Sequence, residues 1–110
     1  MRILNISAQK PDSTGSGTYL SALVRSQLAA GCEPAVLCGA APGDTQGDIP
    51  TGVPVYTVDF DTPELPFHIC GMSDVMPYPS TRYRDLTSQM TSSFEDAFCR
   101  SIERAVAKFE

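Results

Sequence analysis

The order of two patterns in the first thirty residues restricts the folds that this chain can adopt. Residues 2–7 form a short apolar run with the length of a strand that is covered on both faces. From Thr18 the apolar side chains change to helical spacing, at Leu20, Leu23, Val24 and Leu28. Gly31 follows at the position where a left-handed residue commonly ends a helix. A strand followed by a helix predicts the first half of a βαβ unit.

The polar loop between the strand and the helix, residues 8–17, is the first candidate site. It ends in Gly15, Ser16 and Gly17, directly before Thr18. Amides at a helix N-terminus carry partial positive charge, and glycine lets an anion approach them without meeting a Cβ. Ligands of open α/β sheets bind beyond the carboxyl ends of the strands, where this loop would lie. We therefore expect residues 15–18 to bind an anion; the alternative is that the glycines only form a turn.

Two more strands are predicted, one on each side of a long loop. Residues 35–38 are an apolar run after Pro34, which can begin a strand but not lie inside one. Residues 39–54 are rich in glycine and proline, so we expect no regular structure there. Residues 55–58 are β-branched and aromatic and form the third strand, with Phe60 as a candidate extension.

The second half of the chain holds an irregular segment and a long helix. Residues 61–84 contain four prolines among large apolar side chains, so this segment must pack on the core or contact a partner. The helix follows the N-cap Thr87, or starts later at a capping box of Ser92 and Glu95. Its apolar residues repeat at helical spacing and should pack on the sheet. They are Met90, Phe94, Ala97, Phe98, Ile102, Ala105, Val106 and Phe109.

Length and charge exclude several classes of protein. The 110 residues are enough for a single domain, residues 1–110, with its own core. Eight scattered Lys and Arg residues and a net charge of −5 argue against nucleic acid as a partner. No stretch is long and apolar enough to cross a bilayer, so we expect no integral membrane segment.

Cysteine usage points to free thiols and a reducing compartment. The cysteines are Cys32, Cys38, Cys70 and Cys99. Their wide spacing and the single His argue against a zinc site, and we expect most of them to be buried. A nucleophile role is not favoured for any of them, although Arg100 directly follows Cys99 in the sequence. Because the chain also shows no export signal, we expect a cytoplasmic protein.

Polar residues in the irregular segment are weaker candidates. His68 carries an imidazole that can act as an acid or base near neutral pH, but no partner is visible nearby in the sequence. A structural or surface role is therefore favoured. Arg82 and Arg84, on either side of Tyr83, are candidates for gripping an anionic acceptor because guanidinium groups suit phosphate and carboxylate. A solvated loop is the simpler explanation.

The common phosphate-binding loops do not match the glycine segment. A P-loop requires a Lys after the last glycine, where Thr18 stands. A dinucleotide fingerprint requires a third glycine where Leu20 stands, and an acidic residue at the end of the second strand, where Gly39 follows Cys38. Residues 13–18 are closer to the Ser/Thr-rich loop of flavodoxin-like proteins, but out of step by one residue. A flavin- or phosphate-binding module remains an alternative.

A longer match covers most of the chain. The run MRILNIS, the loop ending in GSG, the helix beginning TYLSALVRSQLAA and the segment GCEPAVL together resemble the N-terminal domain of family 4 (group 1) glycosyltransferases. These enzymes have the two-domain GT-B architecture. The segment FHICGMSDVMPYPSTRYRDLT and the long helix after it look like one bacterial branch of the family. The resemblance is most specific in residues 1–38 and less so in residues 60–109.

The resemblance implies a function and a site. In this family the similar domain holds mainly the acceptor, and the nucleotide-sugar donor lies mostly on the C-terminal domain. By resemblance, Gly15, Ser16 and Gly17 would lie near the donor phosphates, and their amides would stabilise the leaving diphosphate. Such enzymes commonly retain the anomeric configuration and need no divalent metal, so we expect no cofactor.

Two parts of the family pattern have no match in the 110 residues: a strand with a His after the last helix, and the donor domain. We therefore expect an α/β, Rossmann-like fragment with a short parallel sheet of about three strands, the truncated N-terminal part of an enzyme. Alone it should transfer nothing. Its first strand would have an open edge, so residues 2–7 are predicted to form a homodimer. A rival is a non-enzymatic interaction domain that uses residues 67–83.

Overall fold

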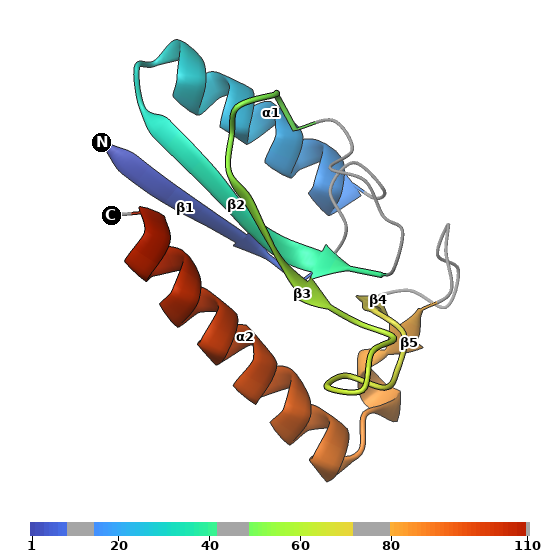
Figure 1. Cartoon of the computed structure of the whole chain (residues 1–110). Helices are drawn as coiled ribbons and strands as arrows, with labels where there is room; N and C mark the ends of the chain where they lie inside the picture. The colour runs from blue at the N-terminus through green and yellow to red at the C-terminus, as the bar shows by residue number, and fades with distance from the viewer. Residues whose placement is uncertain (9–14, 42–48, 72–79, 110) are drawn as a thin grey trace.

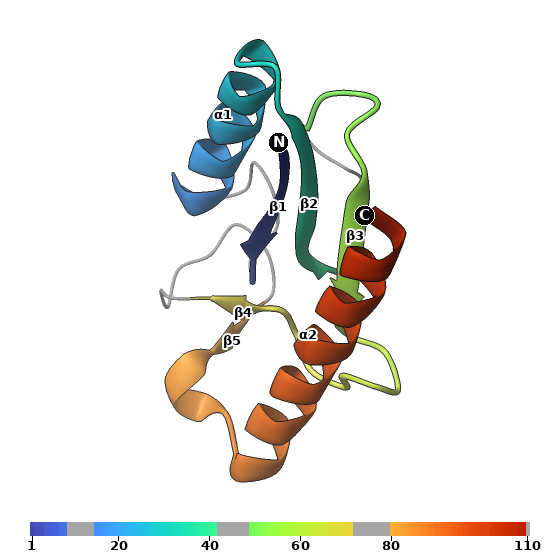
Figure 2. The same ribbon diagram turned by 90° about the vertical axis from the view of Figure 1, so that its left-hand side faces the viewer.

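A parallel sheet of three strands lies between two helices in the computed structural model, which describes residues 1–8, 15–41, 49–71 and 80–109 (Figures 1 and 2). The elements are β1 (Arg2–Ser7), α1 (Gly15–Ala29), β2 (Glu33–Ala40), β3 (Val55–Asp59), β4 (Cys70–Gly71), β5 (Thr81–Arg82), the 3₁₀ helix η1 (Tyr83–Asp85) and α2 (Ser88–Phe109). Strands β4 and β5 pair in a separate small sheet. The arrangement confirms the predicted α/β class, with a short parallel sheet flanked by helices.

The main sheet has the order β1–β2–β3, and its central strand β2 is the most buried. Side chains alternate between the two faces of a strand. Val36 and Cys38 therefore pack with residues of α1, whereas Leu37 packs with residues of α2. The sheet separates two hydrophobic cores. Figure 2 shows α1 and α2 on opposite sides of the sheet.

Helix α1 begins at Gly15 rather than at the predicted Thr18. Gly15, Ser16 and Gly17 thus belong to the first turn of the helix, and not to the preceding loop. The predicted buried face is correct for Leu20 and Val24. It is wrong for Leu28, which is 42% exposed at the last turn, while the polar Ser21 is buried.

The end of α1 follows the prediction for Gly31. The helix stops at Ala29, and Gly31 adopts a φ of 84°, which glycine reaches without steric cost. The N–H of Gly31 donates to the carbonyl of Leu28 at 3.0 Å, and the N–H of Cys32 donates to the carbonyl of Gln27 at 2.9 Å. These two bonds form a Schellman motif that satisfies carbonyls of the last turn.

Strand β2 extends further than predicted at both ends. Gly39 and Ala40 belong to it and not to the loop, and Pro34 lies inside the strand as its second residue, which the prediction excluded. A Cβ on Gly39 would lie 2.6 Å from the carbonyl oxygen of Ala8 and 2.6 Å from Cδ1 of Ile69. Glycine here permits a close approach of other segments to the end of the strand, rather than a break in it. Residues 42–48 of the predicted loop lie outside the described part of the chain.

Strand β1 has the predicted bounds but not the predicted burial on both faces. Ile6 is 50% exposed, although its partner in the sheet, Leu37, is fully buried. The reason is that α2 packs on β2 and β3, and among the described strands β1 pairs with β2 alone. β1 therefore lies at the edge of the sheet that the structure describes.

Helix α2 follows the predicted N-cap. Thr87 Oγ1 accepts a hydrogen bond from the backbone N–H of Met90 at 3.1 Å, and the helix begins at Ser88. The alternative start at the capping box of Ser92 is therefore wrong. The predicted apolar face packs on the sheet through its buried residues, Ala97, Phe98 and Ala105. Val106 departs from the prediction because it is 39% exposed, and the side chain of Phe109 lies outside the described part.

Candidate functional site

The first turn of α1 lies at the carboxyl end of the sheet (Figure 1). Its residues, Gly15 to Thr18, follow β1 and are the predicted anion-binding residues. The first amides of any helix have no partner within the helix, and they carry the positive end of the helix dipole. The backbone of this turn therefore suits an anion better than a flexible loop would. Residues 9–14, which include Ser13 and Thr14 of the flavodoxin-like match, lie outside the described residues.

A pair of polar side chains, Asp61 and His68, lies just beyond the end of β3. Asp61 Oδ1 is 2.9 Å from Nδ1 of His68, and the backbone N–H of Asp61 donates to the carbonyl of Phe67 at 3.1 Å. Asp61 adopts a φ of 56°, a left-handed conformation that is uncommon outside glycine but tolerated by aspartate. In a neutral imidazole whose Nδ1–H donates a hydrogen bond to a carboxylate, Nε2 carries the lone pair and can accept a hydrogen bond from a ligand.

The loop that carries Asp61 and His68 is fixed by several contacts. Thr62 Oγ1 donates to the carbonyl of Asp59 at 3.0 Å, and Leu65 is buried in the core under α2. The ring of Phe67 meets that of Phe60 edge-on, with centroids 5.7 Å apart. Glu64 also forms an ion pair with Arg100 of α2. These contacts hold the Asp61–His68 pair in place at the carboxyl end of β3.

The segment after His68 crosses to the end of β2. Ile69 packs against Gly39, and the β4–β5 pair sets Gly71 opposite Arg82. Thr81 ties this pair to the loop, because its hydroxyl donates to the carbonyl of His68 at 2.8 Å. Sequence reasoning missed this arrangement, since the β4 and β5 strands have two residues each and no periodic pattern. Phe67, Ile69 and Cys70 pack on the core under α2. They are therefore not free to contact a partner, as the interaction-domain alternative would need.

One of the two predicted acceptor residues, Arg82, lies in a local ion pair. Arg82 Nε is 2.7 Å from Oδ2 of Asp85, three residues later. The side chain of Arg82 is partly exposed, and Arg84 lies in η1 on the surface. The β4–β5 pairing sets Arg82 opposite Gly71, three residues after His68. It stays a prediction that either arginine contacts an acceptor.

The cysteines are free thiols, as predicted, but they differ in burial. Cys38 and Cys70 are buried, Cys32 is half-buried and Cys99 is exposed, so the prediction of mostly buried thiols is wrong for Cys99. Burial raises the pKa of Cys70 from 9.0 to about 11, because desolvation disfavours the thiolate. Cys70 therefore stays protonated at neutral pH and is a poor nucleophile.

The described part of the chain contains neither a metal-ligand cluster nor a membrane-spanning helix. Within residues 1–8, 15–41, 49–71 and 80–109, no group of three or more His, Cys, Asp or Glu side chains could hold a metal ion. No helix in these ranges has the length and apolar character that a membrane span requires. The described polar residues at the carboxyl end of the sheet thus remain the candidates.

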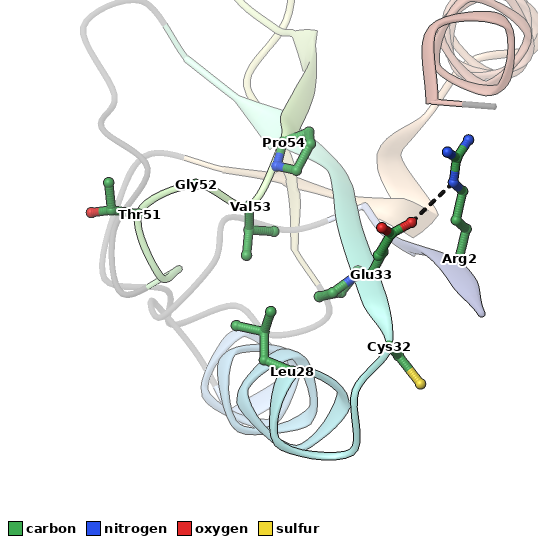
Figure 3. A pocket seen from close by; sticks show the side chains of 9 residues that line it. Arg2, Leu28, Cys32, Glu33, Thr51, Gly52, Val53 and Pro54 are labelled. Carbon is green, nitrogen blue, oxygen red and sulfur yellow. Dashed lines mark hydrogen bonds and ion pairs between the residues drawn. The ribbon is translucent and has the colours of Figure 1, made fainter.

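A hollow of about 420 Å³ lies at the opposite, amino end of the sheet (Figure 3). The turn of Thr51 to Pro54 forms one side, Leu28 of α1 forms another, and Glu33 of β2 with its ion pair to Arg2 forms the third. The sulfur of Cys32 points away from Leu28 (Figure 3). Parallel α/β sheets bind ligands at the carboxyl ends of their strands, so this hollow is the weaker candidate.

Comparisons with known proteins give no match: no family model, no curated protein and no solved structure corresponds to this chain. The functional argument therefore depends on the geometry of the carboxyl end of the sheet. Gly15 at the start of α1, the Asp61–His68 pair and the β4–β5 pair are the features of that end.

Proposed function

We propose that this chain is the acceptor-side domain of a retaining glycosyltransferase of the family 4, GT-B type. Such an enzyme moves a sugar from a nucleotide-sugar donor to an acceptor, and this domain would act together with a donor-binding domain. The observation that carries the proposal is the start of α1 at Gly15, at the carboxyl end of a parallel sheet. The sequence resemblance of residues 1–38 supports it independently.

The chemistry of the helix start suits a leaving diphosphate. As the bond between the sugar and the diphosphate breaks, negative charge grows on the phosphate oxygens. Amides of residues 15–18 that point at these oxygens would stabilise that charge without reorganising, which lowers the barrier. Glycine at positions 15 and 17 leaves the backbone open to a close approach.

The acceptor side of the reaction has fewer candidates. The Asp61–His68 pair lies at the same end of the sheet as the helix start, on a loop that several contacts fix. Arg82 is joined to this loop through β4 and β5. We propose that an acceptor binds over this region, between the two domains of the enzyme. The chain alone would bind weakly and transfer nothing.

The proposal can be tested by nuclear magnetic resonance on the ¹⁵N-labelled chain, titrated with uridine and guanosine diphosphates. We expect the largest shifts at the amides of Gly15, Ser16 and Gly17. The substitution Ser16→Asp should weaken binding by about tenfold, which corresponds to about 1.4 kcal/mol. An added carboxylate repels the diphosphate but favours the helix start itself, so the fold should persist.

The matched control is Ser88→Asp, which adds the same charge to the first turn of α2. It should leave the affinity for the diphosphate unchanged. Shifts confined to the hollow at the amino end of the sheet, or equal affinity in both variants, would contradict the proposal. Flavin mononucleotide serves as the competing probe: tighter binding of this flavin than of either diphosphate would favour the flavodoxin-like alternative.

A further inference from the structure

Within the described residues, β1 lies at the edge of the main sheet, and its backbone has a defined orientation there. The N–H of Glu33 donates to the carbonyl of Met1 at 2.8 Å, so the backbone of Met1 points toward β2. Successive residues of a strand point their N–H and C=O groups to opposite sides. The odd-numbered residues of β1 therefore pair with β2, and the backbones of Leu4 and Ile6 point to the edge.

Apolar side chains accompany this edge. Leu4 packs against the core under α2. Ile6 lies on the same face, because the two residues are two positions apart in the strand. Ile6 is half exposed, since α2 packs on β2 and β3. The side chain of Asn5 lies on the other face, where it exchanges two hydrogen bonds with Gln27 of α1.

The edge also carries little charge. Arg2 is the charged residue of β1, and its Nε lies 3.0 Å from Oε2 of Glu33. Native proteins commonly protect an open edge with lysine, proline or a bulge. β1 has no lysine and no proline, and its register with β2 is continuous from Arg2 to Ser7. The strand can therefore accept another strand without placing like charges opposite each other.

We propose that β1 pairs in antiparallel fashion with β1 of a second copy, about a two-fold axis perpendicular to the sheet. Such an axis keeps the α1 faces of both copies on one side, so facing residues belong to the same face. The pairing sets Leu4 opposite Ile6 of the second copy, with Asn5 on the axis. Leu4 and Ile6 then exchange backbone hydrogen bonds across the interface, and each exposed Ile6 gains an apolar neighbour.

A second copy fits this edge for a physical reason. In each cross-strand pair, both residues must point their backbone N–H and C=O groups to the edge. Both must also carry an apolar side chain on the α2 face. β1 supplies both members, Leu4 and Ile6. The alternative register, with Leu4 opposite itself, would set Ile6 opposite the charged Arg2.

Hydrogen exchange of the chain at high and low concentration tests the pairing residue by residue. The amides of Ile3 and Asn5 bond to β2 and should be protected at every concentration. The amides of Leu4 and Ile6 should be protected only in the dimer and should lose this protection on dilution. A dimer formed through any other surface would leave Leu4 and Ile6 unprotected, and that result would overturn the proposal.

Substitution of Ile6 provides the second test, with light scattering as the readout of mass. Ile6→Lys places an ammonium group opposite Leu4 and should raise the dimer dissociation constant by about a hundredfold. Tyr19→Lys is the matched control, because Tyr19 is an exposed aromatic residue that belongs to α1 and not to the paired strand. It should leave the dissociation constant unchanged. A chain that is monomeric at all concentrations, or an Ile6→Lys variant that dimerises like the original, would refute the pairing.

Discussion

Glycines with different physical roles look alike in this sequence. Gly31 has a φ of 84° and open space around its missing Cβ, so it is required for its backbone conformation. Gly39 lies in an ordinary strand, and it is required because Ala8 and Ile69 approach it closely. The helix pattern before Gly31 predicted its role. The role of Gly39 depends on a residue that is 30 positions away in the sequence.

Replacing Gly39 by alanine should destabilise the chain by about 1–3 kcal/mol, because the new methyl group would overlap Ala8 and Ile69. The measurement is the midpoint of urea unfolding. Adding Ile69→Val should recover part of the loss, since valine lacks the Cδ1 atom that lies nearest to the new group, while the contact with Ala8 remains. Gly31→Ala should cost about 1 kcal/mol through backbone strain alone, with no recovery from Ile69→Val.

The two helices differ in how well local chemistry explains their first residue. Thr87 caps α2 with a hydrogen bond within its own first turn, so this start was predictable from the sequence. α1 instead starts at Gly15, where helix propensity is low. Because glycine disfavours a helix, the sequence predicted a start at Thr18. The structure adds Gly15, Ser16 and Gly17 to the helix.

The two candidate starts of α2 make opposite predictions for alanine substitutions. Thr87→Ala should lower the free energy of unfolding by about 1 kcal/mol, because the N–H of Met90 loses its partner. Ser92→Ala should change it by less than about 0.5 kcal/mol, since Ser92 lies on the exposed face after the helix has begun. Thermal unfolding of both variants checks this, and a larger loss for Ser92→Ala would mean that the helix starts later than Ser88.

At the scale of the whole molecule, the carboxyl end of the sheet is organised by segments far apart in the chain. The loop of Asp61 and His68 is fixed to β3 and α2, and the next residues reach β2. Cys70 is fully buried in this junction. Its raised pKa makes the stability of the whole fold depend on pH in the alkaline range.

The sign of that dependence follows from the protons bound by each state. Between pH 9.0 and about 11 the unfolded chain loses the thiol proton of Cys70, whereas the folded chain keeps it. Stability should therefore fall as the pH rises through this range, by at most about 3 kcal/mol. Urea unfolding at several pH values should show a weaker fall for Cys70→Ala than for the original chain. Cys99→Ala is the matched control for the substitution itself, because it replaces an exposed cysteine in the same way.

The sequence by itself determined the order of the strands and helices of the main sheet and several of the residues that bound them. The apolar runs of β1 and β3, the helical spacing of α2, the cap at Thr87 and the stop at Gly31 all rest on interactions within a few residues. Such local preferences act in every context, so they can be read without the fold. They also predicted that a helix starts close to residues 15–18, which is the basis of the predicted anion site, although α1 includes all four residues.

Only the tertiary structure decided which faces are covered and which distant residues meet. It left Ile6 exposed at the edge, paired β4 with β5, and brought Asp61 to His68 at 2.9 Å. Asp61 and His68 are separated by a turn with two prolines, and no periodic pattern connects them. Contacts of this kind depend on how whole elements pack, because their free energy exists only once both segments are in place. Local propensity cannot supply that information.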